Sequence, residues 1–433
     1  MRVEHARSLV LRNVRIVLPE RTADSANVLI EDGRIARIFG SSSDESLKAG
    51  SLMDLDGFTL FPGFIDVHIH GAVGVDAMEA SADDLCRVSE FLASEGVTAW
   101  LPTFVPAPQE QYERAIRAIS DLMGQQDWER GRPARITSAS DLPSKDRNGL
   151  NADELQAGRL RSQLLGVHYE GPFVNSEQCG ALHREYFRTF KDSADVDVLP
   201  TINHESAIHM MTLAPEIDGG IELIKELKKR NWIVSIGHTR ATTDILDRAL
   251  AAGARHMTHF MNAMTPLHHR APGPVGWGLL QDEVTCDVIS DGVHLDTAIL
   301  KLIVRNKSPE RISLISDAIA AAGLGDGVYE IWGEKISVNN GRTKNARGSI
   351  AGSVITMLDA MRSMLSLGIA ESDVACMASL NPARLLGIER DYGSIEEGKR
   401  ADLVALDDLK RVRLTIVGCA PKGATTSRLC LPF

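Results

Sequence analysis

The sequence lacks an excess of basic residues, a high aromatic content and long apolar runs, and each absence excludes a class of protein. Its 433 residues carry 58 acidic against 47 basic side chains, a net charge of -11. This disfavours nucleic acid or an anionic membrane as the main partner, because both need a basic surface. Aromatic residues make up only 5% of the chain, which argues against a surface that stacks on carbohydrate or on single-stranded nucleic acid. An anionic substrate must therefore be met by a local basic group.

The sequence also lacks paired cysteines, an apolar secretion signal and any apolar run as long as a membrane span. Without a C-x-x-C pair, neither a disulfide framework nor a thiolate zinc site is indicated. We therefore expect a cytoplasmic protein without membrane contact. The six scattered cysteines are Cys86, Cys179, Cys286, Cys376, Cys419 and Cys430.

Two kinds of sequence pattern occur along the chain. Short alternating β-branched segments fill residues 8–60 and return after about residue 390, which predicts strands. Between these ends, short apolar runs alternate with amphipathic segments, as is typical of βα units around a parallel sheet. We expect an α/β fold, a TIM (β/α)8 barrel with a small β-sandwich domain formed by both chain termini. The expected barrel strands are 64–70, 97–103, 164–171, 209–215, 232–239, 255–260, 284–292 and 311–318.

The expected domain limits are 1–57 and 389–433 for the β-sandwich and 58–388 for the barrel. Residues 125–163 are long and polar, and we expect them to form an inserted surface loop.

Polar side chains fall at the carboxyl ends of five of the eight expected strands, where barrel enzymes place their active sites. His68 and His70 end the first strand, and the H-x-H spacing puts both imidazoles on one face. A single histidine near a strand end is more often a packed residue, but the convergence of six positions predicts a metal site. Nitrogen and carboxylate ligands suit zinc, with iron, manganese and cobalt as alternatives. The six residues are His68, His70, Glu170, His238, His259 and Asp317.

Two of the polar residues suggest catalytic roles. Asp317 is the candidate general base and acid, because a carboxylate beside a metal can take a proton from the attacking water and pass it to a leaving amine. His294, after the seventh expected strand, is the candidate donor to the oxyanion.

The motifs around these residues resemble those of the N-acetylglucosamine-6-phosphate deacetylases of the amidohydrolase superfamily, from Phe61 to about Asp407. The resemblance implies a metal-dependent barrel hydrolase, a homodimer, and removal of the acetyl group from an amino sugar phosphate. The motifs are PGFIDVHIHG, GVHYEGPFVN, SIGHT, THFMNAMTPLHHRAPG, SDGVHLD, LISDAIAAAGLGDG, the Gly-Ser-Ile-Ala-Gly-Ser run that ends at Ser353, and SLNPARLLG.

By position, the resemblance makes Glu170, His238 and His259 metal ligands and Asp317 the acid/base. It implies phosphate binding by Asn262, Ala263 and Arg270, and a substrate contact by His294. Arg270 offers a planar fork for phosphate, and the neighbouring His268 and His269 add positive character.

The chain departs from the family pattern at three places. It keeps His68 and His70, which several members lack, so we expect that two metal ions can bind. It reads Gly180-Ala-Leu-His183, so the histidine expected to contact the sugar is displaced by one residue. The segment 125–163 and the tail after Leu414 have no clear counterpart.

Two other functions stay open at this stage. Another amidohydrolase, such as a D-aminoacylase, a dihydroorotase-like enzyme or a deaminase, often bridges two metals with a lysine on strand four. The run HMMTLAP has none, and Glu170 can bridge instead. A non-catalytic scaffold would predict a broken ligand set, whereas all six residues are present. The sequence leaves open the sugar stereochemistry, the phosphate requirement, and the identity and number of the metals.

Overall fold

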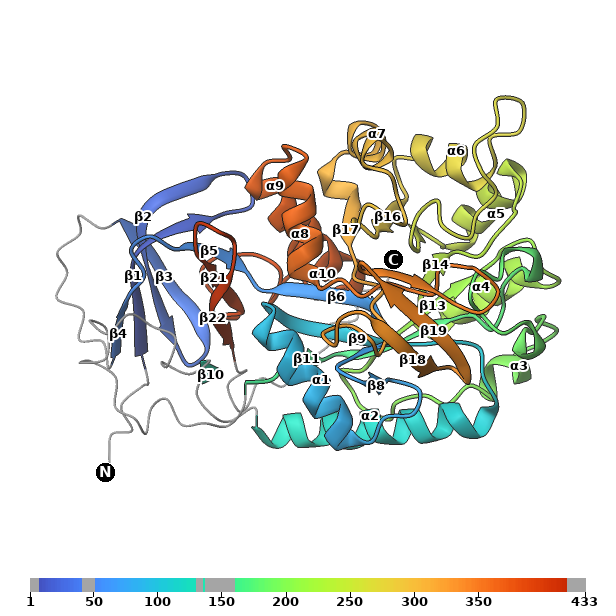
Figure 1. The fold of residues 1–433 in the computed structure, drawn as a ribbon, viewed down its shortest axis with the longest axis horizontal. Helices are drawn as coiled ribbons and strands as arrows, with labels where there is room; N and C mark the ends of the chain where they lie inside the picture. The colour runs from blue at the N-terminus through green and yellow to red at the C-terminus, as the bar shows by residue number, and fades with distance from the viewer. Residues whose placement is uncertain (1–7, 41–50, 130–134, 137–159, 419–433) are drawn as a thin grey trace, which may run out of the picture.

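A barrel and a smaller β domain make up the chain (Figure 1). The computed structural model describes residues 8–40, 51–129, 135–136 and 160–418. In Figure 1 the β domain lies on the left and the barrel on the right.

Eight parallel strands form the barrel, each paired with its neighbour along the chain. Backbone hydrogen bonds join the segment after the last strand to the end of the first: Asp317 N donates to the His68 carbonyl at 3.0 Å, and His70 N and Gly71 N donate to the Ala318 carbonyl at 2.8 Å and 3.1 Å. The expected barrel and its eight strands are confirmed. The strands are β6 (Phe64–Ile69), β9 (Val97–Phe104), β12 (Gly166–Glu170), β13 (Ile208–Leu213), β14 (Ile233–Ile236), β15 (His256–Met257), β16 (Thr285–Val288) and β17 (Ile312–Leu314).

Helices cover the barrel strands from outside, which explains why strands such as β9 are buried along their whole length. Local signals set the helix ends. Ser81 and Asp84 form a capping box at the start of α1, and Gly253 ends α5 in the left-handed conformation. The helices are α1 (Ala82–Ser94), α2 (Gln109–Glu129), α3 (Ala194–Asp197), α4 (Gly220–Lys229), α5 (Thr243–Ala252), α6 (Gly273–Leu280), α7 (Thr297–Lys307), α8 (Met357–Ser366), α9 (Glu371–Ala375) and α10 (Asn381–Leu386).

Both chain ends form one sheet around an apolar core, as expected for the small domain. Its order is β10-β22-β21-β5-β1-β2-β3, with β4 also paired to β1. Since β5 belongs to this sheet, the sheet runs a few residues past the expected limit at 57, and the full domain division stays a prediction. The strands are β1 (Ser8–Val17), β2 (Thr22–Glu31), β3 (Arg34–Gly40), β4 (Ser51–Asp54), β5 (Thr59–Pro62), β10 (Arg135–Ile136), β21 (Leu403–Leu406) and β22 (Val412–Val417).

The expected loop over 125–163 is wrong at its two edges. Helix α2 continues to Glu129, and the short strand β11 (Gln163–Leu164) pairs with β9. Between them, β10 pairs with the edge of β22, which needs only backbone groups and so tolerates a polar sequence. Residues 137–159 lie outside the described residues, as do 419–433 of the tail.

An antiparallel hairpin follows the last barrel strand and was not predicted. It comprises β18 (Gly327–Ile331) and β19 (Glu334–Asn339), and β20 (Arg342–Lys344) pairs with β19 as a third strand. Apolar residues of the hairpin pack on the segment after β17 through Ile319, Ala320 and Ala321. A second short hairpin, β7 (Gly71–Ala72) with β8 (Val75–Asp76), follows β6.

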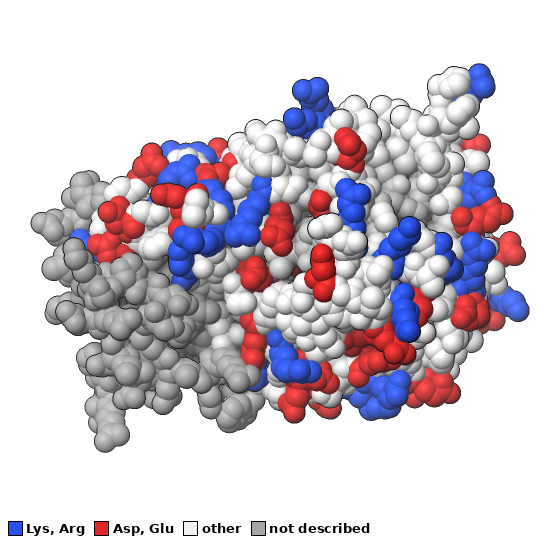
Figure 2. Space-filling model, viewed as in Figure 1, with Lys and Arg blue, Asp and Glu red and all other residues white. Residues whose placement is uncertain are grey.

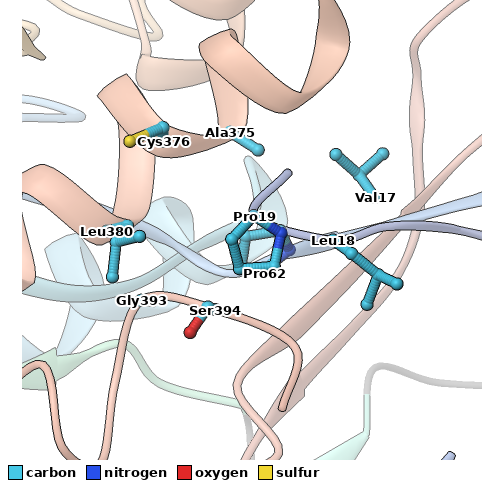
Figure 3. A pocket seen from close by; sticks show the side chains of 9 residues that line it. All are labelled: Val17, Leu18, Pro19, Pro62, Ala375, Cys376, Leu380, Gly393 and Ser394. Atoms are coloured by element: carbon cyan, nitrogen blue, oxygen red, sulfur yellow. The ribbon is translucent and has the colours of Figure 1, made fainter. Parts of the chain in front are cut away.

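The barrel and the terminal sheet pack closely where they meet. Figure 3 shows Val17, Pro62 and Cys376 around a cavity of about 10 Å³ at this junction, which is room for about one water molecule. No substrate fits there.

The face of the molecule drawn in Figure 2 carries no strongly basic patch among the described residues. Figure 2 shows acidic and basic side chains interspersed over the visible side. Among the described residues, no helix combines the length and the apolar character that crossing a membrane requires.

Candidate metal and catalytic site

The structure brings the six predicted residues together at the carboxyl ends of the barrel strands. Their ring nitrogens face one another: His68 Nε2 lies 3.3 Å from His70 Nε2, and His238 Nε2 lies 3.2 Å from His259 Nε2. Two ligands on a tetrahedral zinc ion lie roughly 3.3 Å apart, given Zn–N bonds of about 2.0–2.1 Å. The spacing of each pair therefore fits a shared ion.

Glu170 connects the two histidine pairs. Its Oε1 lies 2.9 Å from both His238 Nε2 and His259 Nε2, and its Oε2 lies 3.5 Å from His70 Nε2. Two groups with metal-ligand spacing result, His68 with His70 and Glu170, and Glu170 with His238 and His259. Because Glu170 belongs to both, one carboxylate can bridge two ions.

Backbone carbonyls orient two of the rings. His70 Nδ1 lies 3.2 Å from the Thr103 carbonyl, and His238 Nδ1 lies 2.7 Å from the Gln178 carbonyl. A carbonyl accepts only from an N–H, so each ring carries its proton on Nδ1 and offers the Nε2 lone pair to the cluster. This is the tautomer that a metal requires.

Three residues of the cluster have an unusual backbone conformation. His238, His259 and Asp317 have φ values of 47°, 33° and 50°, in a region that non-glycine residues seldom adopt and that costs roughly 1–3 kcal/mol each. Such strain concentrates at functional sites, where it fixes the direction of a side chain. It supports a functional origin for this cluster.

The buried carboxylate of Glu170 favours a cation within the cluster. Burial alone would raise the pKa of Glu170, but the neighbouring His68, His238 and His259 rings hold it well below its usual range. Burial lowers the pKa of His259, yet the hydrogen bond and charge of Glu170 raise it to about 9. An ionised, buried carboxylate thus draws cations to itself, and a divalent ion fits these donors.

Asp317 lies beside the first pair of histidines. Its Oδ1 is 3.2 Å from His70 Nε2 and 3.4 Å from His68 Nε2. Its carbonyl accepts a hydrogen bond from Ser353 N at 2.7 Å, so both the β6 and the Ser353 segments hold it. The carboxylate is placed to ligate or to exchange protons at the cluster.

His294 is held by Asp291. Its Nδ1 lies 2.7 Å from Asp291 Oδ2, and its backbone N–H donates to Asp291 Oδ1 at 2.8 Å. Burial would raise the pKa of Asp291, but the hydrogen bonds and charge of His294 lower it. The ionised Asp291 fixes the ring, which leaves Nε2 for a substrate.

The residues predicted to bind phosphate lie in two different places. Asn262 and Ala263 come three and four residues after His259, and Asn262 Nδ2 donates to the His259 carbonyl at 3.2 Å. Arg270 and His269 are exposed on the loop before α6, which projects from the body of the molecule in Figure 1. Within the described part of the chain, no hydrogen bond or ion pair joins these two side chains to the cluster.

His183 does not present a free ring to the site. Its Nε2 lies 3.2 Å from the Trp332 carbonyl, and its Nδ1 lies 3.3 Å from Glu185. The expected sugar contact is thus engaged with the β18–β19 hairpin.

Trp332, at the tip of this hairpin, was missed by the sequence reasoning. Its ring lies 5.2 Å from the His70 ring, edge to face. The signal was present, because VYEIWGEKISV alternates as two strands do around a glycine turn.

Comparison with known proteins agrees with the fold and the cluster. The chain is 36% identical over 399 residues to an N-acetylgalactosamine-6-phosphate deacetylase of Escherichia coli O157:H7, covering 92% of this chain and 95% of that one. It is 34% identical over 414 residues to an N-acetylglucosamine-6-phosphate deacetylase of Bacillus subtilis, covering 95% and 96%. The crystal structure of an N-acetylglucosamine-6-phosphate deacetylase from Pasteurella multocida superposes with a TM-score of 0.79 at 27% identity, covering 94% and 97%.

The family assignment rests on most of the chain. Residues 59–428 match the family model described as "Amidohydrolase family". This range contains all eight barrel strands and all six residues of the cluster. The chain belongs to the amidohydrolase family.

Proposed function

We propose that the protein removes the acetyl group from an N-acetyl amino sugar 6-phosphate, with N-acetylglucosamine-6-phosphate as the first candidate substrate. The observation that carries the proposal is the cluster at the barrel mouth, where Glu170 joins two histidine pairs beside Asp317. The similarity to deacetylases of both glucosamine and galactosamine phosphates supports the substrate class. The products are the amino sugar phosphate and acetate.

The proposal for the metal comprises two ion sites that share Glu170. His238, His259 and Glu170 would hold one divalent ion, and His68, His70 and Glu170 would hold a second, with zinc as the first candidate and iron, manganese or cobalt as alternatives. When bound, the metal lowers the pKa of water and polarises the acetyl carbonyl.

Asp317 moves the proton in this proposal. The carboxylate accepts a proton from the attacking water, and the protonated acid then donates it to the departing amine nitrogen. His294 donates a hydrogen bond from Nε2 to the substrate, and Asp291 holds its ring in place. Asp317 thus transfers the proton, and His294 stabilises the negative charge that develops on the substrate oxygen.

Phosphate binding completes the proposal. Asn262 and Ala263 border the cluster, while Arg270 and His269 provide the local basic group that an acidic protein needs for an anionic substrate. The homodimer and the cytoplasmic location stay predictions from the resemblance and from the scattered cysteines.

The substrate proposal is tested with zinc-loaded protein and an assay for released acetate. We expect the highest kcat/KM on N-acetylglucosamine-6-phosphate or N-acetylgalactosamine-6-phosphate, and a far lower value on unphosphorylated N-acetylglucosamine. Equal rates with and without phosphate would contradict the assignment. Preferential cleavage of N-acetyl-D-amino acids would instead favour the D-aminoacylase alternative.

A further inference from the structure

The β18–β19 hairpin brings an indole to the edge of the candidate site. Ile331 pairs with Glu334, so Trp332 and Gly333 form a two-residue turn, with φ values of 55° and 73°. Positive φ at both positions is the geometry of a type I′ turn, which fits the twist of a tight hairpin. The turn fixes Trp332 at the tip.

The indole has an unused donor. Its ring stands at 84° to the His70 ring, with the centroids 5.2 Å apart. Its Nε1 is buried, and it has no hydrogen-bond partner in the described part of the chain. A buried N–H without a partner is unfavourable, so an acceptor supplied by a ligand would satisfy it.

The hairpin tip is tied to the loop that borders His238. His183 Nε2 lies within hydrogen-bonding distance of the Trp332 carbonyl, at 3.2 Å, and Arg347 donates to the Ala181 carbonyl at 2.8 Å. This loop approaches the cluster closely, since a Cβ at Gly180 would lie 3.6 Å from His238 Cε1. The hairpin tip therefore meets this loop near the cluster, with Trp332 beside His70 and Gly180 beside His238.

We propose that Trp332 is a substrate-contacting residue that sets sugar specificity, with its indole N–H donating a hydrogen bond to a ring substituent oxygen of the amino sugar. His183 is a positioning residue that holds the hairpin tip through the Trp332 carbonyl. The proposal deepens the proposed function and rests on it. It also accounts for the displaced histidine, because His183 is used for the hairpin and the indole takes over the sugar contact.

The direct test is Trp332→Phe, which keeps an aromatic ring and removes the N–H. We expect KM for the preferred N-acetyl amino sugar phosphate to rise about 10-fold, with kcat changed less than about 3-fold and the bound zinc unchanged. The matched control is Tyr329→Phe on the same hairpin, which removes a hydroxyl that donates to the Gly325 carbonyl at 2.9 Å. This control should leave KM and kcat as in the wild type.

The positioning role of His183 has its own readout. We expect His183→Ala to raise KM as Trp332→Phe does, and His183→Gln, which keeps a donor for the carbonyl, to restore most of the affinity. The double variant Trp332→Phe with His183→Ala should be no worse than the stronger single variant.

Binding without turnover separates this contact from catalysis. In an Asp317→Asn background, adding substrate should change tryptophan fluorescence, and Trp332→Phe should remove most of that change. An unchanged KM and fluorescence response in Trp332→Phe would overturn the inference while leaving the deacetylase proposal intact. Loss of kcat and zinc together would also overturn it, since it would show that the ring only supports His70. Wild-type protein that cleaves no amino sugar phosphate would refute both proposals.

Discussion

At the scale of single residues, Asp317 carries the chemistry of the proposed mechanism. Its carboxylate lies within 3.4 Å of both His68 and His70 and is held through its backbone from two sides. We predict that Asp317→Asn lowers kcat by roughly 10²- to 10⁴-fold, the range for removal of a general acid–base. Zinc content should fall little, because Glu170, His238 and His259 remain.

Acetate release and zinc analysis on the same sample check this prediction. A kcat within a few-fold of the wild-type value would refute the acid/base role. Complete loss of zinc would instead identify Asp317 as an essential ligand.

A second residue gives a pH prediction away from the cluster. His209 stacks on Trp232, with ring centroids 5.1 Å apart, and its Nε2 accepts from Ile202 N at 3.0 Å. Burial lowers the pKa of His209 from 6.5 to about 4. The unfolded chain therefore binds the proton more readily, and stability is lost as the pH falls from about 6.5 towards 4.

We predict that His209→Gln, which keeps an acceptor but does not titrate, reduces the loss of unfolding free energy over this window by about 1–3 kcal/mol. Urea unfolding of chelator-treated wild type and variant at pH 7 and pH 4.5 measures the difference. Parallel pH profiles for the two proteins would show that His209 contributes nothing.

At the scale of elements, the capping box of α1 is a local device that can be tested independently of function. Ser81 and Asp84 exchange hydrogen bonds of 3.2 Å and 3.0 Å at the helix start. We predict that Ser81→Ala lowers the unfolding free energy by about 1 kcal/mol and leaves kcat and KM unchanged. Ser94→Ala, at the other end of α1, removes only a bond to the Phe91 carbonyl and serves as the control. Equal stability of the two variants would contradict the capping role.

The sequence predicted the elements whose apolar and polar residues follow a regular pattern. All eight barrel strands were found, because strands covered on both sides read as short apolar runs between amphipathic helices. The expected loop began before the end of α2, because the last residues of this helix are as polar as a loop. Strand β10 could not be foreseen, because it pairs through two residues whose partners in β22 lie about 280 positions away.

At the scale of the whole molecule, topology explains why the ligands could be predicted. Parallel strands deliver their carboxyl ends to one rim, so Glu170, His238 and His259 meet although each ends or follows a different strand. No comparable rule of topology predicts the contact between His183 and the Trp332 carbonyl. It joins positions 149 residues apart through a backbone atom that leaves no mark in the sequence.

Substrate contacts on the exposed loop before α6 are also hard to predict from the sequence. The resemblance assigns Arg270 to phosphate and the neighbouring His269 adds positive character, but the fold leaves both exposed on a projecting loop. The ligand set is thus better determined than the substrate contacts, because buried strand ends are fixed by the barrel and loops are not.

We propose that two metal ions bind at the barrel mouth, with Glu170 as their shared ligand. Zinc per subunit, measured by mass spectrometry on zinc-loaded and desalted protein, tests it most directly. We predict about two ions in the wild type and about one in His68→Ala, because His238, His259 and Glu170 still hold an ion in the variant. One ion per subunit in both proteins would contradict the two-metal site.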